Sequence, residues 1–179
     1  MRVIGGEFRS RRLKSLPGLA TRPTPDRLRE TLFDVLGPRI EGAVFVDAYA
    51  GTGAVGIEAL SRGAARCVFL ENGRRAAEAI RENLHALGIA ERASVIVGKA
   101  AVSLARQPAD IVFLDPPYEM SAEYAAALGE IGDRRQETGV RMVIAQHSVR
   151  FDPGETHGEL RRVRILKQGD NAFSFYERI

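Results

Sequence analysis

A glycine-rich turn and two acidic residues near it are the first positions in this chain that could do chemistry. The segment Asp47-Ala48-Tyr49-Ala50-Gly51-Thr52-Gly53-Ala54-Val55-Gly56 has glycines at the spacing G-x-G-x-x-G. This spacing allows a tight turn between a strand and a helix, and the N–H groups of the helix N-terminus can then bind a ligand. Glu71 follows 20 residues after Gly51, where a carboxylate can accept hydrogen bonds from both hydroxyls of a ribose. Together, the turn and the acid predict a site for a cofactor that contains a nucleoside.

The charge of Asp47 bears on which cofactor binds. NAD and S-adenosylmethionine (SAM) both present an adenosine ribose, so the glycine turn and Glu71 leave both of them open. A carboxylate at the tip of the first strand attracts an ammonium group, such as that of a methionine moiety, and would repel the pyrophosphate of a dinucleotide. Asp47 therefore favours SAM, and capping of the following helix is the alternative role for this residue.

The segment Asp115-Pro116-Pro117-Tyr118 predicts the second half of the site. It follows an apolar strand, and open α/β sheets bind their ligands at the carboxyl ends of such strands. Two consecutive prolines stiffen the turn and remove two N–H donors, so carbonyl acceptors remain beside the acid. An exocyclic amino group could donate one hydrogen to the Asp115 carboxylate and the other to the Pro116 carbonyl, which would turn its lone pair toward an electrophilic methyl group. Tyr118 could stack on the base, and an ordinary turn is the alternative interpretation of Asp-Pro-Pro.

The rest of the chain predicts an α/β fold that positions these segments. Short apolar runs alternate with stretches of helical spacing, and runs that are apolar on both faces belong in a parallel sheet covered by helices. We predict strands at 44–46, 67–70, 95–97, 111–114 and 140–145, and helices at 55–62, 76–87, 102–106 and 123–131. Two final runs, 160–166 and 173–176, predict an antiparallel hairpin that ends the sheet. An earlier helix begins near Thr24, which can cap it, with Pro25 at its first position.

Composition excludes several classes of protein. The 179 residues are 45% hydrophobic and 27% charged, which is typical of one globular domain and not of a disordered or fibrous chain. No uncharged stretch approaches the roughly 18 apolar residues of a membrane span, and the start of the chain lacks the apolar core of a secretory signal. The single cysteine, Cys67, excludes a disulfide framework and a cysteine-based zinc site and indicates the cytoplasm. The histidines have no second ligand at metal spacing, so we expect no metal.

Positive charge is concentrated at the N-terminus. Residues 1–22 contain one acid, Glu7, while the net charge of the whole chain is only +3. A basic segment on a nearly neutral body predicts contact with a polyanion, because each neutralised phosphate releases condensed counterions, and a solvated surface segment is the alternative. We therefore divide the chain into a basic arm at 1–23, with at most a hairpin, and a catalytic domain at 24–179. The candidate binding residues of the arm are Arg2, Arg9, Arg11, Arg12, Lys14 and Arg22.

Several motifs resemble one known family. The Asp115 to Tyr118 segment and the Asp47 to Gly56 loop are similar to SAM-dependent methyltransferases that modify exocyclic amino nitrogens of nucleic acids. More narrowly, residues 2–6 (RVIGG), 22–33 (RPTPDRLRETLF) and 53–63 (GAVGIEALSRG) resemble the bacterial RsmD family, the 16S ribosomal RNA guanine-N2 methyltransferases. The similarity runs nearly from end to end.

The resemblance implies a Rossmann-like fold with a seven-stranded, mostly parallel sheet, an antiparallel last strand and a small N-terminal β-hairpin arm that contacts RNA. It also implies transfer of a methyl group from SAM to the N2 amino group of one guanine in 16S ribosomal RNA. We expect the enzyme to act in the cytoplasm as a monomer. The substrate would be naked RNA or an assembly intermediate of the small subunit. Carried over to this chain, Asp47, Gly51 and Gly53 would hold the methionine end of SAM, Glu71 its ribose, and Asp115, Pro116, Pro117 and Tyr118 the target base.

Lys99 departs from the family pattern. Related enzymes commonly have an Asp or Asn at this point, whose side chain accepts from the adenine amino group, and a lysine cannot accept. We therefore expect backbone groups of Lys99 and Ala100 to bind adenine, with the Lys99 side chain in solvent. From the residues alone, an NAD-dependent oxidoreductase and a non-catalytic RNA-binding module remain the alternative functions, although the Asp115 to Tyr118 segment argues against the second.

Overall fold

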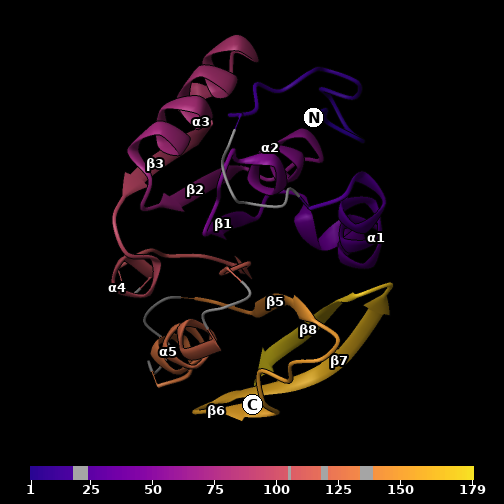
Figure 1. Ribbon diagram of the computed structural model, residues 1–179, viewed down its shortest axis with the longest axis vertical. Helices are drawn as coiled ribbons and strands as arrows, with labels where there is room; N and C mark the ends of the chain where they lie inside the picture. The colour runs from indigo at the N-terminus through magenta and orange to yellow at the C-terminus, as the bar shows by residue number, and fades with distance from the viewer. Residues whose placement is uncertain (18–23, 105, 118–120, 134–138) are drawn as a thin grey trace.

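One eight-stranded sheet, with helices packed on both faces, organises this computed structural model (Figure 1). The structure describes residues 1–17, 24–104, 106–117, 121–133 and 139–179. The strands are β1 (Val44–Ala48), β2 (Arg66–Glu71), β3 (Ala93–Val97), β4 (Ile111–Leu114), β5 (Met142–Ser148), β6 (Thr156–His157), β7 (Leu160–Gln168) and β8 (Asn171–Arg178). The helices are α1 (Asp26–Leu36), α2 (Ala54–Ser61), α3 (Arg74–Ala86), α4 (Ala100–Leu104) and α5 (Ser121–Gly132), with 3-10 turns η1 (Gly37–Ile40) and η2 (Ala90–Arg92).

The strand order is β3-β2-β1-β4-β5-β8-β7-β6. Neighbouring strands from β3 to β5 are parallel, whereas β8 is antiparallel to both β5 and β7, so the predicted C-terminal hairpin and antiparallel last strand are confirmed. The expected number of seven strands is wrong, because Thr156 and His157 pair with Arg161 and Leu160 to form β6. A strand of two residues is too short to show the alternation that marks strands in a sequence.

Two apolar clusters hold the sheet between its helices. Alternate side chains of a strand point to opposite faces, so Phe45 and Phe113 join the cluster beneath α1, α2 and α3, while Val46 and Val112 join the cluster beneath α4 and α5. Burial on both faces explains why β4 and the first three residues of β1 are continuous apolar runs.

The start of α1 differs from the prediction. Pro25 has extended backbone angles and occupies the N-cap position, so the helix begins at Asp26. Thr24 is buried, and its hydroxyl donates to Gln146 Oε1 at 3.3 Å instead of capping the helix. A partner 122 residues away in the chain cannot be read from local cap patterns. The helix predicted at 102–106 begins two residues earlier than predicted, at Ala100.

The N-terminal arm is a minimal hairpin. Arg2 and Arg12 form a single antiparallel bridge, and the Val3 N–H donates to the Arg11 carbonyl at 3.0 Å. Val3 and Leu13 are buried in the same apolar cluster as α1 and α2. In the described ranges, no helix has the length and apolar character needed to cross a membrane.

Candidate active site

The carboxyl ends of three adjacent parallel strands bring the predicted acidic residues together. Asp47 lies in β1, between β2, which ends at Glu71, and β4, which is followed by Asp115. The charges of Asp115 and Glu71 both act on Asp47 and raise its pKa. Three residues separated by up to 68 positions in the sequence therefore lie at the same end of the sheet, where the parallel strands have their carboxyl ends.

Glu71 fixes the glycine turn. Its Oε2 atom accepts from the Gly51 N–H at 2.8 Å, and its Oε1 atom accepts from the Gly73 N–H at 2.7 Å. Gly51 and Gly53 have φ angles of 57° and 80°, which are left-handed conformations that favour glycine. Because a carboxylate has about four acceptor sites, Glu71 can hold the turn and still accept from the hydroxyl of a ribose.

Asp47 caps the helix that follows the turn. Its Oδ2 atom accepts from the Gly56 N–H at 2.8 Å, so the alternative role that the sequence offered is present in the structure. A Cβ atom on Gly56 would lie 2.3 Å from the Phe69 ring, which explains the third glycine of the motif. Asp47 is only 2% exposed, and its burial raises the pKa of its carboxyl well above the usual value, against the opposing effect of the Gly56 hydrogen bond. A cationic ligand would favour the ionised form.

Asp115 is the acid that is best placed to accept from a substrate. Its side chain is partly exposed, yet the surrounding protein desolvates the carboxyl and raises its pKa to about 7. No N–H or O–H group of the described residues donates to it. Pro116 is buried and Pro117 is exposed, while Tyr118 lies outside the described residues.

Lys99 lies directly before α4, and Ala100 is the first residue of that helix. The Gly98 N–H donates to the Glu71 carbonyl at 3.1 Å, which brings this segment beside the end of β2. The Lys99 side chain is exposed, its carbonyl accepts from the Ser103 N–H at 3.1 Å, and Ala100 is buried. The side chain at position 99 therefore lies in solvent, and the contact of this segment with Glu71 is the backbone hydrogen bond of Gly98.

These three carboxylates suit a cationic ligand better than an anionic one. When they are ionised, Asp47, Glu71 and Asp115 give this end of the sheet a negative potential, which would attract a sulfonium or ammonium group and repel a pyrophosphate. Among the described residues, no group of three or more histidine, cysteine, aspartate or glutamate side chains is arranged to hold a metal ion.

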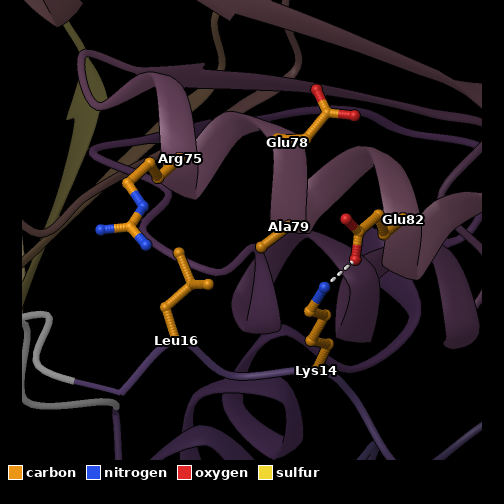
Figure 2. Close-up of a pocket in the computed structure, with 6 residues that line it drawn as sticks. All are labelled: Lys14, Leu16, Arg75, Glu78, Ala79 and Glu82. Carbon is orange, nitrogen blue, oxygen red and sulfur yellow. Dashed lines mark hydrogen bonds and ion pairs between the residues drawn. The ribbon is translucent and has the colours of Figure 1, made fainter.

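The basic residues of the arm fall into two groups. Arg2 pairs with Asp26 at 3.2 Å, Arg11 donates to the Ala86 carbonyl at 3.3 Å, and Lys14 pairs with Glu82. Figure 2 shows the Lys14–Glu82 pair beside an open groove of about 180 Å³ between the arm and α3. The lining of this groove is Lys14, Leu16, Arg75, Glu78, Ala79 and Glu82, so its two cations are matched by two acids. Arg9 and Arg12 are exposed and have no ion-pair partner among the described residues, and Arg22 lies outside those residues.

A family profile covers almost the whole chain. The profile of the family described as Conserved hypothetical protein 95 matches residues 1–177. The chain belongs to this family, the RsmD family. This RsmD-family chain is 37% identical over 134 residues to Ribosomal RNA small subunit methyltransferase D of Haemophilus influenzae. The aligned region covers 72% of this chain and 69% of that protein.

Solved structures share the fold of this RsmD-family chain. The yhhF protein of Escherichia coli matches with a TM-score of 0.82 and 34% identity, over 99% of this chain and 97% of that one. An RNA methyltransferase from Salinibacter ruber, solved with S-adenosyl-L-homocysteine, matches with a TM-score of 0.67 and 17% identity, over 87% of this chain and 93% of that one. The second likeness concerns the fold alone.

The residues that anchor the RsmD-family arm were missed by the sequence analysis. Glu58 is fully buried in α2, where its carboxylate accepts from the N–H groups of Ile4 and Gly5, both at 2.8 Å. Ser61 donates to the Gly5 carbonyl at 2.6 Å, and a Cβ atom on Gly6 would lie 1.9 Å from the Ser61 carbonyl oxygen. Every residue of α2 is buried, and a helix without a polar face must be covered on all sides. The lone acid in this apolar helix was the sequence feature that could have indicated the anchor.

Arg29 completes the anchor from α1. This fully buried guanidinium donates to the Arg2 carbonyl at 2.6 Å and to Asp26 at 3.0 Å, and it lies 3.6 Å from the Glu58 carboxylate. Burial lowers the pKa of Arg29, while the charges of Glu58 and Asp26 oppose that shift. A pair of buried opposite charges therefore holds the start of the arm against α1 and α2.

Asn83 joins the end of the arm to the glycine turn. Its side chain accepts from the Lys14 N–H at 2.7 Å and donates to the Lys14 carbonyl at 3.1 Å. The same amide nitrogen lies 3.4 Å from the Thr52 carbonyl, within the glycine turn. The arm and the glycine turn thus share one buried hydrogen-bond partner, Asn83 on α3.

Proposed function

We propose that this RsmD-family protein transfers the methyl group of SAM to the N2 amino group of one guanine in 16S ribosomal RNA. The observation that supports this best is the meeting of Asp47, Glu71 and Asp115 at one edge of the sheet, beside a segment rich in acceptors. The relative named Ribosomal RNA small subunit methyltransferase D supports the substrate class, and the likeness to a fold solved with S-adenosyl-L-homocysteine supports the cofactor. The oxidoreductase alternative is not favoured.

The cofactor-binding residues are Asp47, Gly51, Gly53 and Glu71, with backbone groups of Lys99 and Ala100 at the adenine end. SAM supplies an electrophilic methyl group on a positively charged sulfur. Glu71 is already oriented by two backbone N–H groups and has acceptor capacity left for the ribose. Asp47 faces the cationic end of the cofactor from a buried position, where its charge acts over a short distance with little solvent screening.

Asp115 and Pro116 orient the target nitrogen. The Asp115 carboxylate accepts one hydrogen of the guanine N2 amino group and the Pro116 carbonyl accepts the other, so that the lone pair of the nitrogen points toward the methyl group. Pro117 stiffens the turn, and we assign Tyr118 to stack on the base. The nitrogen becomes acidic once it is methylated, and a carboxyl with a pKa of about 7 is well suited to take up the released proton.

The arm supplies contacts to the RNA backbone. Within the described part of the arm, Arg9 and Arg12 are the exposed cations without an ion-pair partner, and we assign them to phosphates together with Arg22. Arg2, Arg11 and Lys14 add to the positive field but are held by protein groups. The substrate is naked 16S ribosomal RNA or an assembly intermediate of the small subunit, and the enzyme is proposed to act as a cytoplasmic monomer.

The test uses tritium transfer from labelled SAM to ribosomal RNA of cells that lack the gene. Deproteinised 16S RNA and small subunits are assayed side by side, and mass spectrometry then maps the modified nucleotide. We expect one N2-methylguanine. Asp115→Ala is expected to slow transfer by about 100-fold or more, while calorimetry shows SAM binding largely intact. Binding of NAD without binding of SAM, or equal loss of SAM binding and transfer in Asp115→Ala, would contradict the proposal.

A further inference from the structure

Strand β7 carries a second group of exposed cations. Arg161, Arg164 and Lys167 are exposed, and none of the three has an ion-pair partner within the part of the chain that the structure describes. Arg162, in contrast, pairs with Asp152 and Glu155. Arg161 lies opposite Glu177 in the register, an acid that pairs with Arg39 at 4.0 Å, whereas Arg164 lies opposite Phe175 and Lys167 opposite Ala172. Of the three exposed cations, Arg164 and Lys167 therefore have no acid opposite them.

Apolar side chains lie between these cations on an open edge of the sheet. Val163 is 54% exposed and Ile165 is 42% exposed. The last strand, β6, pairs only with Leu160 and Arg161, so the outer edge of β7 from Val163 onward has no strand beside it in the described ranges. We call the segment from Val163 to Lys167 the β7 surface. A basic, bulged edge strand can also serve to block edge-to-edge aggregation, so its place relative to the site must decide its role.

The register places the β7 surface at the level of the target-base site. Leu114, directly before Asp115, pairs with Ala145, Ala145 pairs with Ser174, and Ser174 pairs with Ile165. Three steps between neighbouring strands correspond to about 14 Å. The arm packs on α2 and α3, which adjoin β1, β2 and β3, so β4 lies between the arm and β7 in the strand order. In Figure 1 the arm occupies the upper part of the molecule and β7 the lower part.

We propose that the β7 surface is a second RNA-contact surface, which binds the substrate strand on the side of the target base opposite to the arm. This inference rests on the proposed function, since it concerns the same RNA. By the alternation along the strand, Arg164 lies on the face of Phe175, whereas Lys167 and Ile165 lie on the opposite face. The two cations therefore neutralise backbone phosphates from either side of the open edge, while Ile165 and Val163, which lies in the bulge, present apolar contacts to bases or riboses. An RNA that is held by the arm on one side of the Asp115 turn and by the β7 surface on the other presents the base between these two contacts to the methyl group of SAM.

The test measures binding of deproteinised 16S ribosomal RNA from cells that lack the gene, over a series of KCl concentrations. Each cation that neutralises a phosphate of single-stranded RNA contributes about 0.7 to the slope of log K against log salt, or roughly fourfold in affinity at 0.15 M salt. Arg164→Gln/Lys167→Gln is therefore expected to bind about 15-fold more weakly, with a slope that is shallower by about 1.4. Arg164→Lys/Lys167→Arg is expected to restore both values.

The matched control removes the same charge near the amino ends of β2 and β4, away from the carboxyl ends that hold the candidate site. Arg66 is the first residue of β2 and Arg106 lies between α4 and β4; both are exposed, and neither has an ion-pair partner among the described residues. Arg66→Gln/Arg106→Gln is expected to retain nearly all of the affinity and slope. SAM binding, measured by calorimetry, is expected to be the same in all variants.

Equal affinities of the β7 variant and the control would overturn the inference. Self-association of the β7 variant in gel filtration with unchanged RNA binding would also overturn it and would assign these cations to protection of the sheet edge. If the wild-type protein binds the RNA and loses affinity in the β7 variant, but transfers no methyl group, the β7 surface stands and the proposed function fails. The two hypotheses are thus separated by one set of samples.

Discussion

Replacing Asp115 by asparagine is expected to stabilise the protein and to slow methyl transfer, because an amide cannot take up the released proton. Desolvation raises the pKa of Asp115 to about 7, above its ordinary value near 3.8, so the folded state disfavours the ionised carboxylate. A group whose pKa is raised in the folded state in this way costs no stability below about pH 4 and costs progressively more as the pH rises to about 7. Asparagine keeps the shape and an acceptor oxygen but does not ionise, so it escapes this cost.

The size of the effect follows from the pKa shift. A shift of about 3 units corresponds to about 4 kcal/mol of unfolding free energy at pH 8, because each unit is worth about 1.4 kcal/mol. Asp115 is partly exposed and solvent screens part of its charge, so we take about half of this figure, or about 2 kcal/mol. At pH 5 the cost of the ionised carboxylate is less than half as large, because the folded protein keeps the group protonated.

The assay is urea denaturation of the wild type and Asp115→Asn at pH 5 and pH 8, without ligand, with methyl transfer measured on the same preparations. The stability advantage of the variant should grow between the two pH values. Asp152→Asn is the matched control, because hydrogen bonds from Arg162 and Gly154 lower the pKa of Asp152 to about 2 and leave it ionised at both pH values. An advantage of Asp115→Asn that is equal at both pH values, or larger at pH 5, would refute the desolvation of this carboxylate.

Two further predictions concern the cofactor acid and the arm. Burial raises the pKa of Asp47, so binding of the cationic SAM should release a proton from this carboxyl. The calorimetric enthalpy of SAM binding should therefore depend on the ionisation enthalpy of the buffer in the wild type and much less in Asp47→Asn. An equal dependence in both proteins would show that Asp47 does not titrate. Glu58→Ala should cost about 3–5 kcal/mol and expose the amides of Ile4 and Gly5 to hydrogen exchange, because these amides would lose their acceptor and the buried Arg29 would keep only Asp26 as an opposite charge. Glu82→Ala, at an exposed ion pair, should cost less than about 1 kcal/mol. Unchanged protection of residues 1–13 in Glu58→Ala would contradict the anchor.

The local pattern of the sequence determined most of the fold. Apolar runs of strand length alternate with helical stretches, and this alternation alone predicts a parallel sheet covered by helices. The glycine turn and Glu71 were found because their spacing is a property of one strand–helix–strand unit. Asp115 was placed near them because parallel strands end at the same edge of a sheet, whichever residues lie between them.

The tertiary structure alone decided the partners of the charged residues. The sequence shows six basic residues near the N-terminus, but only the fold pairs Arg2 and Lys14 with acids and leaves Arg9 and Arg12 open. It also assigns Glu58, 54 positions from Ile4, to hold the arm, and it brings the cations of β7 to the level of Asp115. A sequence records the type and spacing of residues, whereas the worth of a charge depends on its burial and on neighbours that only the folded chain brings within a few ångströms.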